Sequence, residues 1–208
     1  MKRVTAAALL VLGLALGLSA CGQGTGASQP GLPPLPTGVE VRFPAAPANT
    51  YLSLMTDAGE SVYQLPVAAG QTSAAPNPVQ WRAASERAVA AETLVPQGVT
   101  ASLSPSGVKA LLLHWVMWQD KNSDGKQDSG EALDLMTHDR VAYASAALRV
   151  TFQTASPDMT QVWALREGWS RAEHEVYLPL DSKTYRRSLR SAEVQRYTLH
   201  VTTPITSQ

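Results

Sequence analysis

The chain has 208 residues, of which 44% are hydrophobic and 16% are charged, and this composition supports one domain with a sizeable core. The formal net charge is zero and the lysines and arginines form no basic cluster, so nucleic acid is not an expected partner. The single cysteine, Cys21, excludes a disulfide within one molecule.

Residues 1–20 have the pattern of a secretory signal peptide. Lys2 and Arg3 give it a positive start, and residues 4–18 are almost entirely apolar but too few to span a membrane. The run leads into Leu18-Ser19-Ala20-Cys21, which resembles the lipobox of bacterial lipoproteins. An ordinary signal peptide followed by an incidental cysteine is the alternative.

The lipobox resemblance implies cleavage before Cys21, a diacylglycerol on its sulfur and a further acyl chain, such as palmitate, on the new amino terminus. Two or three acyl chains hold a protein firmly at a membrane, whereas one chain binds only marginally. The expected location is therefore the cell envelope, on the outer or plasma membrane and facing away from the cytoplasm. The membrane is the expected partner, through the N-terminal lipid anchor.

Residues 21–38 are rich in Gly, Pro, Ser and Thr and predict a flexible tether, followed by a single globular domain at 39–208. Residues 39–43 alternate apolar and charged side chains and predict a strand. Residues 51–55 and 61–67 flank a turn-forming segment and predict a hairpin, whose second strand is placed at a sheet edge by Pro66. Alanine, glutamate and arginine in residues 81–92 favour a short helix.

Residues 108–118 are the most apolar run after the signal peptide. Apolar residues at 108, 111, 112, 115 and 116 fit a helix, as an EF-hand would need. The run is also apolar on nearly every face, as in a central strand covered on both sides, and this second interpretation is favoured here.

The second half of the domain predicts more strands, at 148–153, 162–165, 175–180 and 197–201. Asp181 is expected to cap a helical turn that runs through Leu189. Short strands at this spacing predict a mainly β fold, an antiparallel β-sandwich-like domain with one or two short helices.

Residues 120–131 have the spacing of a calcium-binding EF-hand loop. Oxygen-bearing side chains stand at positions 1, 3, 5, 9 and 12, and Gly125 stands at position 6, where the chain must turn sharply. The expected calcium ligands are the side chains of Asp120, Asn122, Asp124, Asp128 and Glu131 and the main-chain carbonyl of Lys126. A solvated acidic turn that binds no ion is the alternative.

This pattern resembles the calcium loops of adhesin-type sandwich repeats in bacterial surface proteins and, more loosely, dockerin and EF-hand loops. The resemblance covers 12 of the 208 residues and implies one structural calcium ion that rigidifies a surface domain. Position 8 is usually aliphatic in paired EF-hands, but here it is Gln127, and no second such loop occurs in the sequence. A single calcium loop is therefore expected rather than half of a regulatory pair.

No catalytic arrangement is evident, so the chain is not expected to be an enzyme. Gly168-Trp169-Ser170-Arg171 lacks the second glycine of a nucleophile elbow. The four histidines have no zinc-binding spacing; they are His114, His138, His174 and His200. Alternation along a strand would point His174 away from both Glu173 and Glu175.

Tryptophan placement leaves a second hypothesis open. Trp115, Trp118, Trp163 and Trp169 are expected to pack in the core, and a sugar-binding platform is the alternative. The second hypothesis is accordingly an envelope carrier or binding protein for a small apolar molecule or a glycan. The sequence does not identify the protein or glycan partner.

Overall fold

The computed structural model describes residues 33–202, which belong to one compact unit. The predicted signal peptide, Cys21 and residues 21–32 of the predicted tether lie outside the described residues. The strands are β1 (Glu40–Arg42), β2 (Thr50–Thr56), β3 (Ser61–Val67), β4 (Ser73–Ala74), β5 (Val89–Ala90), β6 (Ala101–Ser104), β7 (Lys109–Gln119), β8 (Leu135–Met136), β9 (Arg140–Ala144), β10 (Leu148–Ala155), β11 (Asp158–Leu165), β12 (Gly168–Tyr177), β13 (Tyr185–Ala192), β14 (Arg196–Thr198) and β15 (His200–Val201). The helices are two 3₁₀ helices, η1 (Pro78–Arg87) and η2 (Ala91–Leu94).

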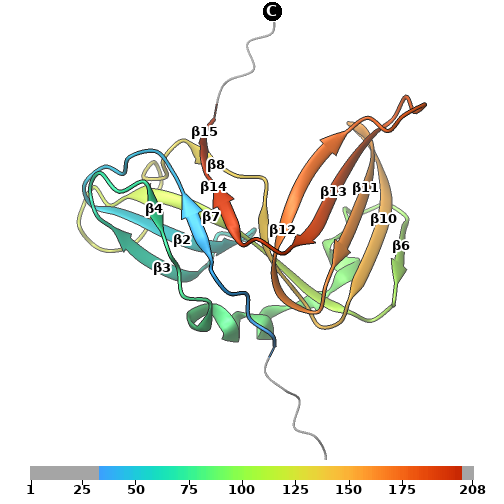
Figure 1. Cartoon of the computed structure of the whole chain (residues 1–208), viewed down its shortest axis with the longest axis horizontal. Coiled ribbons are helices and arrows are strands. Elements are labelled where there is room, and N and C mark those ends of the chain that lie inside the picture. The colour runs from blue at the N-terminus through green and yellow to red at the C-terminus, as the bar shows by residue number, and fades with distance from the viewer. Residues whose placement is uncertain (1–32, 203–208) are drawn as a thin grey trace, which may run out of the picture. The chain divides into compact units, whose positions relative to one another are not determined.

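The main sheet has ten strands in the order β3-β2-β7-β9-β12-β13-β11-β10-β6, with β5 added beside β7. A three-stranded sheet, β14-β1-β4, and a two-stranded sheet, β15-β8, complete the fold. In Figure 1, β1 to β4 and β14 form one group of strands and β6 and β10 to β13 form another. The eleven-residue strand β7 joins the two groups, because it pairs with β2 along one part and with β9 along another.

The first core lies between β2, β3 and β7 of the main sheet and the small sheet that contains β1 and β14. Leu54, Leu113 and Met117 from the main sheet are fully buried against Val41 and Leu199. Aromatic rings also meet there edge to face, with centroid separations of 5.2 Å for Tyr63–Trp81, 5.8 Å for Trp81–Trp115 and 6.0 Å for Trp115–Tyr197. Two sheets that pack face to face through such a core make a sandwich.

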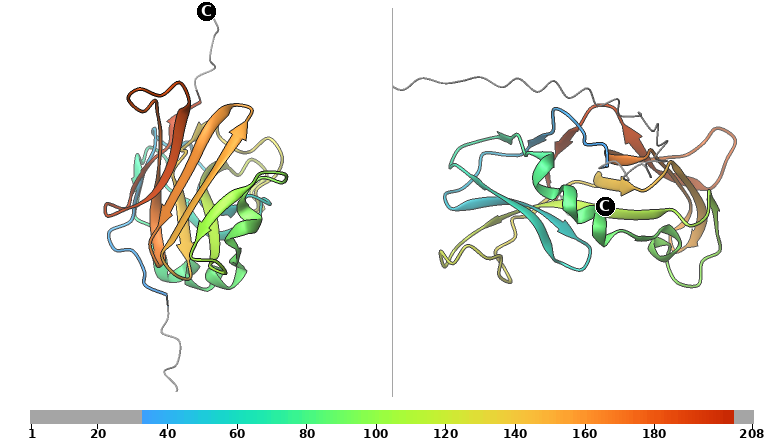
Figure 2. Two further views of the ribbon diagram at one scale, coloured as in Figure 1. Left: turned by 90° about the vertical axis from the view of Figure 1, so that its right-hand side faces the viewer. Right: turned by 90° about the horizontal axis from the view of Figure 1, so that it is seen from below.

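The second core lies on one face of strands β9 to β13. Val150, Phe152, Trp163 and Leu189 pack there, because alternate residues of neighbouring strands point to the same face. Ala91 at the start of η2 is fully buried against this group and covers one end of it. Figure 2 shows these strands curving together into one layer.

The mainly β, sandwich-like fold predicted from the sequence is confirmed, with helix limited to the short η1 and η2. The predicted strands at 51–55, 61–67, 108–118 and 148–153 appear as β2, β3, β7 and β10. Pro66 lies on an edge strand as expected, because β3 ends the main sheet. Two strand pairs are parallel rather than antiparallel, β1 with β14 and β11 with β13.

The predicted helical turn from Asp181 through Leu189 is wrong. Residues Tyr185–Ala192 form β13, which pairs with β12 on one side and with β11 on the other. Asp181 has a φ of 60° in the connection between β12 and β13, where it caps no helix. The four-residue spacing of Tyr185 and Leu189 fits a helix and a strand equally, and pairing on both edges decides for the strand.

Three other segments differ from the prediction. The predicted helix at 81–92 begins earlier, at Pro78, where the Asn77 side chain accepts a hydrogen bond from the Val79 amide. The predicted strand at 175–180 is the end of β12, which runs from Gly168 to Tyr177. The predicted last strand breaks at Leu199, so that β14 and β15 join different sheets.

The described part of the predicted tether packs on the domain instead of standing free. The carbonyl of Pro34 accepts a hydrogen bond of 2.9 Å from the Trp169 amide. Leu35 packs against the first core and Pro36 is buried. The domain therefore begins before residue 39. No helix among residues 33–202 has the length and apolar character needed to cross a membrane.

Candidate functional site

The loop at 120–131 leaves the end of β7 and returns beside it. The Gln119 amide donates to the Glu131 carbonyl at 2.9 Å, and the Leu133 amide donates to the Met117 carbonyl at 2.8 Å. Trp118 and Ala132 form an isolated β-bridge. The loop is therefore entered from a strand, so the helix–loop–helix arrangement of an EF-hand, which stood as the alternative for residues 108–118, is absent here.

Asp120 and Glu131, the two ends of the loop, are buried at 5% and 4% exposure. The Asp120 carboxylate accepts hydrogen bonds from the amides of Ser123, at 2.6 Å, and Gly125, at 2.9 Å. The Glu131 carboxylate accepts one from the Lys121 amide, at 2.8 Å, and another through its second oxygen from the Asp128 amide, at 2.9 Å. The backbone thus turns its N–H groups toward both carboxylates.

The middle of the loop lies outward. Asn122, Asp124, Lys126 and Asp128 are exposed. Oxygens of Asn122 and Asp124 accept the amides two residues ahead, at 3.1 and 2.8 Å, and the Asn122 amide group donates to Asp128 Oδ2 at 2.9 Å. Gly125 has a φ of +73°, the conformation for which glycine was expected at position 6.

The loop has buried carboxylates at its two ends, but its acidic side chains are not gathered around one point. Among residues 33–202, no three His, Cys, Asp or Glu side chains are grouped closely enough to hold a metal ion. No described Lys, Arg or His pairs with the buried Asp120 or Glu131, and Lys121 Nζ instead donates to the Gly130 carbonyl at 2.7 Å. Gln127 Oε1 is also buried without a hydrogen-bond donor. These oxygens lack a positive partner within the described residues, which is the condition that a bound cation relieves.

The loop is held to the hairpin of β2 and β3. The Gln64 side chain donates to the Gly125 carbonyl at 3.2 Å, and the Asp120 amide donates to the Asn49 carbonyl at 2.8 Å. At the end of β7, Trp118 stacks on Tyr51 with ring centroids 4.8 Å apart. An ion in the loop would therefore stabilise the contact between β7 and this hairpin.

The tryptophans pack in the interior, which excludes the sugar-binding platform. Trp115, Trp118 and Trp169 are exposed by 2% or less, and Trp163 by 7%. The fifth, Trp81, is 1% exposed. A sugar platform needs exposed ring faces, and none of the five tryptophans presents one.

Two of the histidines that are far apart in the sequence come together. The rings of His138 and His174 have centroids 4.9 Å apart. Alternation along β12 places His174 away from its neighbours, as expected: Glu173 pairs with Arg171, whereas His174 Nε2 accepts from Arg187 Nε at 2.6 Å. Sequence spacing gives no sign of this pair, because β12 and the segment before β9 meet only through sheet pairing.

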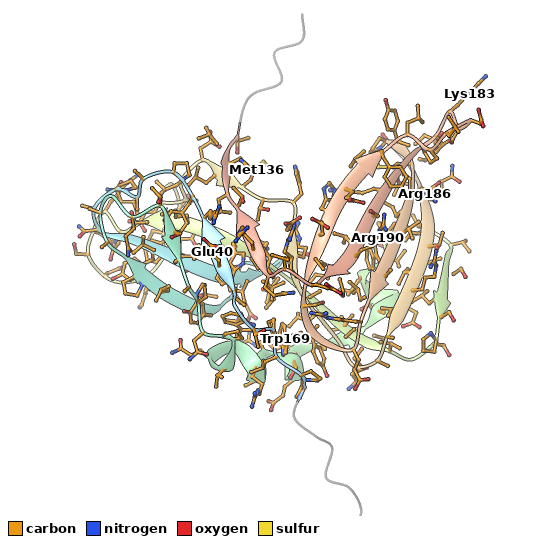
Figure 3. The ribbon with its side chains drawn as sticks, in the orientation of Figure 1. Glu40, Met136, Trp169, Lys183, Arg186 and Arg190 are labelled. Carbon is orange, nitrogen blue, oxygen red and sulfur yellow. The ribbon has the colours of Figure 1, made fainter. Side chains whose placement is uncertain are left out.

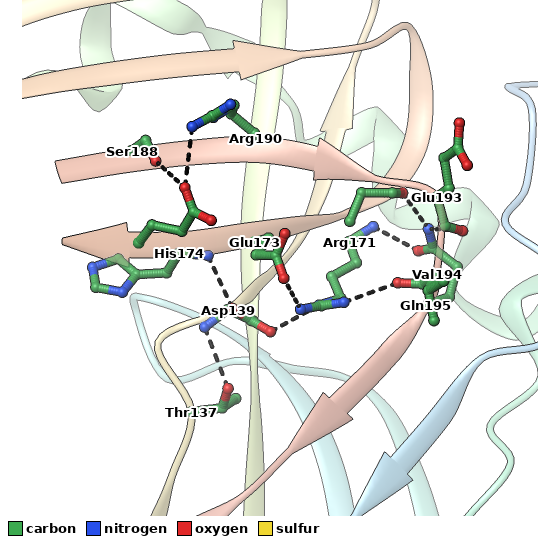
Figure 4. Close-up of polar contacts among 12 residues, drawn as sticks. Thr137, Asp139, Arg171, Glu173, His174, Ser188, Arg190, Glu193, Val194 and Gln195 are labelled. Atoms are coloured by element: carbon green, nitrogen blue, oxygen red, sulfur yellow. Dashed lines mark hydrogen bonds and ion pairs between the residues drawn. The ribbon is translucent and has the colours of Figure 1, made fainter. Parts of the chain in front are cut away.

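A partly buried ion-pair network lies beside His174 (Figure 4). Arg171 Nε donates to Asp139 Oδ2 at 2.8 Å, and Arg171 also pairs with Glu173 at 2.7 Å. The other oxygen of Asp139 accepts the His174 amide at 2.9 Å. Burial lowers the pKa of His174 to about 4, with Arg187 acting in the same direction, so that the ring is neutral at pH 7.

Comparison with known proteins gives no further guide to function: no family model matches the chain, and no curated protein or solved structure matches it either.

Proposed function

We propose that this chain is a lipid-anchored protein of the cell envelope whose β domain is stabilised by one calcium ion in the loop at 120–131. The observation that carries the proposal is the burial of Asp120 and Glu131 at the two ends of a loop with calcium-ligand spacing, without a cationic partner among the described residues. Four backbone N–H groups offset part of the cost of burying these two carboxylates, and a bound cation would offset more of it.

Calcium would be held by the ligand set expected from the sequence. Asp120 and Glu131 supply carboxylate oxygens from the buried ends, and the Lys126 carbonyl supplies a main-chain oxygen. Asn122, Asp124 and Asp128 would turn inward from their exposed positions to complete the site. Because the loop is single, we expect a dissociation constant of about 10⁻⁴–10⁻³ M, the range of extracellular calcium modules.

The expected stabilisation follows from mass action. At about ten times the dissociation constant, bound calcium adds roughly 1.4 kcal/mol to the free energy of unfolding. For a domain of this size that corresponds to a rise in melting temperature of about 3–6 °C. The melting temperature of the full chain is to be measured with calcium and with a chelator, and binding is to be measured by calorimetry.

Two variants test the ligand assignment. Glu131→Gln removes a carboxylate charge and should abolish the response to calcium. Lys126→Ala keeps the main-chain carbonyl and should retain the response. Equal melting temperatures with calcium and chelator, together with no heat of binding, would refute the calcium site.

The lipid anchor is tested separately at Cys21. Cys21→Ser removes the sulfur that would carry the diacylglycerol, so the variant should move from the membrane fraction to the soluble fraction. Radiolabelled palmitate should label the unsubstituted chain and not the variant. Equal membrane association of the two chains would contradict the anchor without bearing on calcium.

A further inference from the structure

The inner face of β9 to β13 is apolar at one end and polar at the other. The apolar end holds the side chains of the second core. At the other end, inward positions carry Arg140, Gln161, His174 and Arg187. The pairing registers place His174 opposite Leu189 of the second core, and Arg187 opposite Gln161. Directly paired residues point to the same face, so these polar groups share the face that the core occupies.

A cavity of about 260 Å³ opens where the two kinds of side chain meet. Its polar wall contains Arg140, Arg187, His138, His174 and Gln161. Its apolar wall contains Leu112, Phe152, Trp163 and Leu189. Small-molecule sites combine these two kinds of wall, and the mouths of curved β-sheets are among their usual places.

Several polar groups of this wall lack partners. The Gln161 side chain is only 7% exposed, yet no hydrogen bond joins it to a described residue. Arg140 forms no ion pair with a carboxylate among residues 33–202. Arg187 Nε donates a hydrogen bond to the neutral ring of His174. The two outer guanidinium nitrogens of Arg187 have no partner among the described residues. The wall therefore offers hydrogen-bond donors on Arg140 and Arg187 that no acceptor among the described residues engages.

The charge of the cavity is positive. Two arginines line it against one carboxylate, Asp57, whose side chain is 72% exposed and lies 3.4 Å from His114 Nδ1. Burial lowers the pKa of Arg140, which expresses the cost of keeping this cation partly out of water. Charged residues on the inner face of an edge strand can prevent that strand from pairing with another chain. This does not explain the charges here, because β9, β11, β12 and β13 are all interior strands of the sheet. An anion is the ligand that such a wall would bind.

We propose that this cavity binds a small organic anion, a carboxylate carried on an aromatic or branched apolar group. The carboxylate would pair with Arg140 and Arg187, since a guanidinium matches a carboxylate with two parallel hydrogen bonds. The apolar group would lie against Phe152, Trp163 and Leu189. The volume equals roughly nine water molecules at about 30 Å³ each, room for about ten non-hydrogen atoms.

This site is independent of the proposed calcium loop. Leu112, in the apolar wall, and Asp120, in the loop, are eight residues apart along β7, which corresponds to roughly 26 Å of extended strand. Failure of one proposal therefore leaves the other standing. The proposed ligand differs from the small apolar molecule or glycan of the second hypothesis, because the cavity is lined by two arginines and the tryptophans are buried.

Phenylacetate, which has the carboxylate, the ring and the expected size, is the probe for calorimetry on the full chain. Phenylacetamide has the same shape without charge, acetate lacks the ring, and inorganic phosphate is an anion without an apolar part. Phenylacetate should bind at least about tenfold more tightly than each of these, since a hydrogen-bonded charge and a buried ring both contribute. No heat from phenylacetate at millimolar concentration, or equal affinity for phenylacetamide, would overturn the proposal.

Variants locate the binding site. Arg140→Gln and Arg187→Gln should each weaken phenylacetate binding about tenfold. Arg190→Gln is the matched control. Arg190, labelled in Figure 3, lies on the same strand as Arg187 but is exposed. It pairs with Glu175 at 3.1 Å. Unchanged affinity in both cavity variants would overturn the proposal. Should these variants unfold, the comparison of phenylacetate with phenylacetamide on the unsubstituted chain still decides it.

Discussion

Gly168→Ala should destabilise the domain by displacing the segment that enters it. Gly168 has a φ of +81°, and a Cβ built there would lie 2.8 Å from Pro34 Cδ and 2.9 Å from the Pro34 carbonyl oxygen. A carbon atom does not approach that closely, so either β12 or the segment at 33–36 must move. The segment is the weaker of the two, because β12 is paired on both edges.

The magnitude has two parts. Alanine in the left-handed conformation costs about 1–2 kcal/mol wherever it occurs. Displacing the segment breaks the hydrogen bond from the Trp169 amide to Pro34, worth about 1 kcal/mol. It also exposes Leu35 and Pro36, worth about 1–2 kcal/mol more. The extra cost is therefore about 2–3 kcal/mol, because no more can be lost than the segment at 33–36 contributes to stability.

Gly59→Ala isolates the second part. Gly59 has a φ of +83°, but nothing lies within 4 Å of its built Cβ. Both variants therefore carry the same backbone cost, and only Gly168→Ala adds the close contact with Pro34. The melting temperature of Gly168→Ala should lie roughly 4–12 °C below that of Gly59→Ala. Equal melting temperatures for the two variants would refute the packing of residues 33–36 on β12.

Three further variants test the ion-pair network and the histidine beside it. Asp139→Ala should lower the free energy of unfolding by about 3 kcal/mol, because it removes the less exposed of the two carboxylates that pair with Arg171, whose side chain is 13% exposed. Glu173→Gln, at 44% exposure, should cost less than about 1 kcal/mol. Urea unfolding compares the two variants, and equal costs would count against this difference between the two pairs. Burial lowers the pKa of His174 from 6.5 to about 4, so between these values the unfolded chain takes up a proton that the folded chain does not. Stability should therefore fall as the pH decreases through this window, and His174→Gln should flatten that part of the profile; superimposable urea midpoints against pH would contradict the reasoning.

The sequence predicted the strands of this domain best where one face of a strand is buried and the other is exposed to solvent. β10 alternates buried and exposed side chains along its first half, and β7 is apolar enough to show that both of its faces are covered. Local patterns did not distinguish a strand from a helical turn at Tyr185–Ala192, because the partners of β13 lie on strands elsewhere in the chain. They also missed β9, five residues whose place between β7 and β12 is set by pairing alone.

For the loop at 120–131, the residue types and their spacing are local properties, so the sequence was enough to mark Asp120 and Glu131 as the two ends of the proposed calcium site. The tertiary structure decided that a strand leads into the loop and that these two carboxylates are buried while Asp124 and Asp128 are exposed.

The charged cavity belongs to the tertiary structure alone. Arg140, Gln161, His174 and Arg187 come from four different strands, and nothing in their spacing marks them as neighbours. The sequence by itself determined which segments extend, where they turn and which oxygens one loop can gather, since these depend on residues close together in the chain. Strand order and the inward face of each strand depend on long-range pairing, and these decided which side chains surround the cavity.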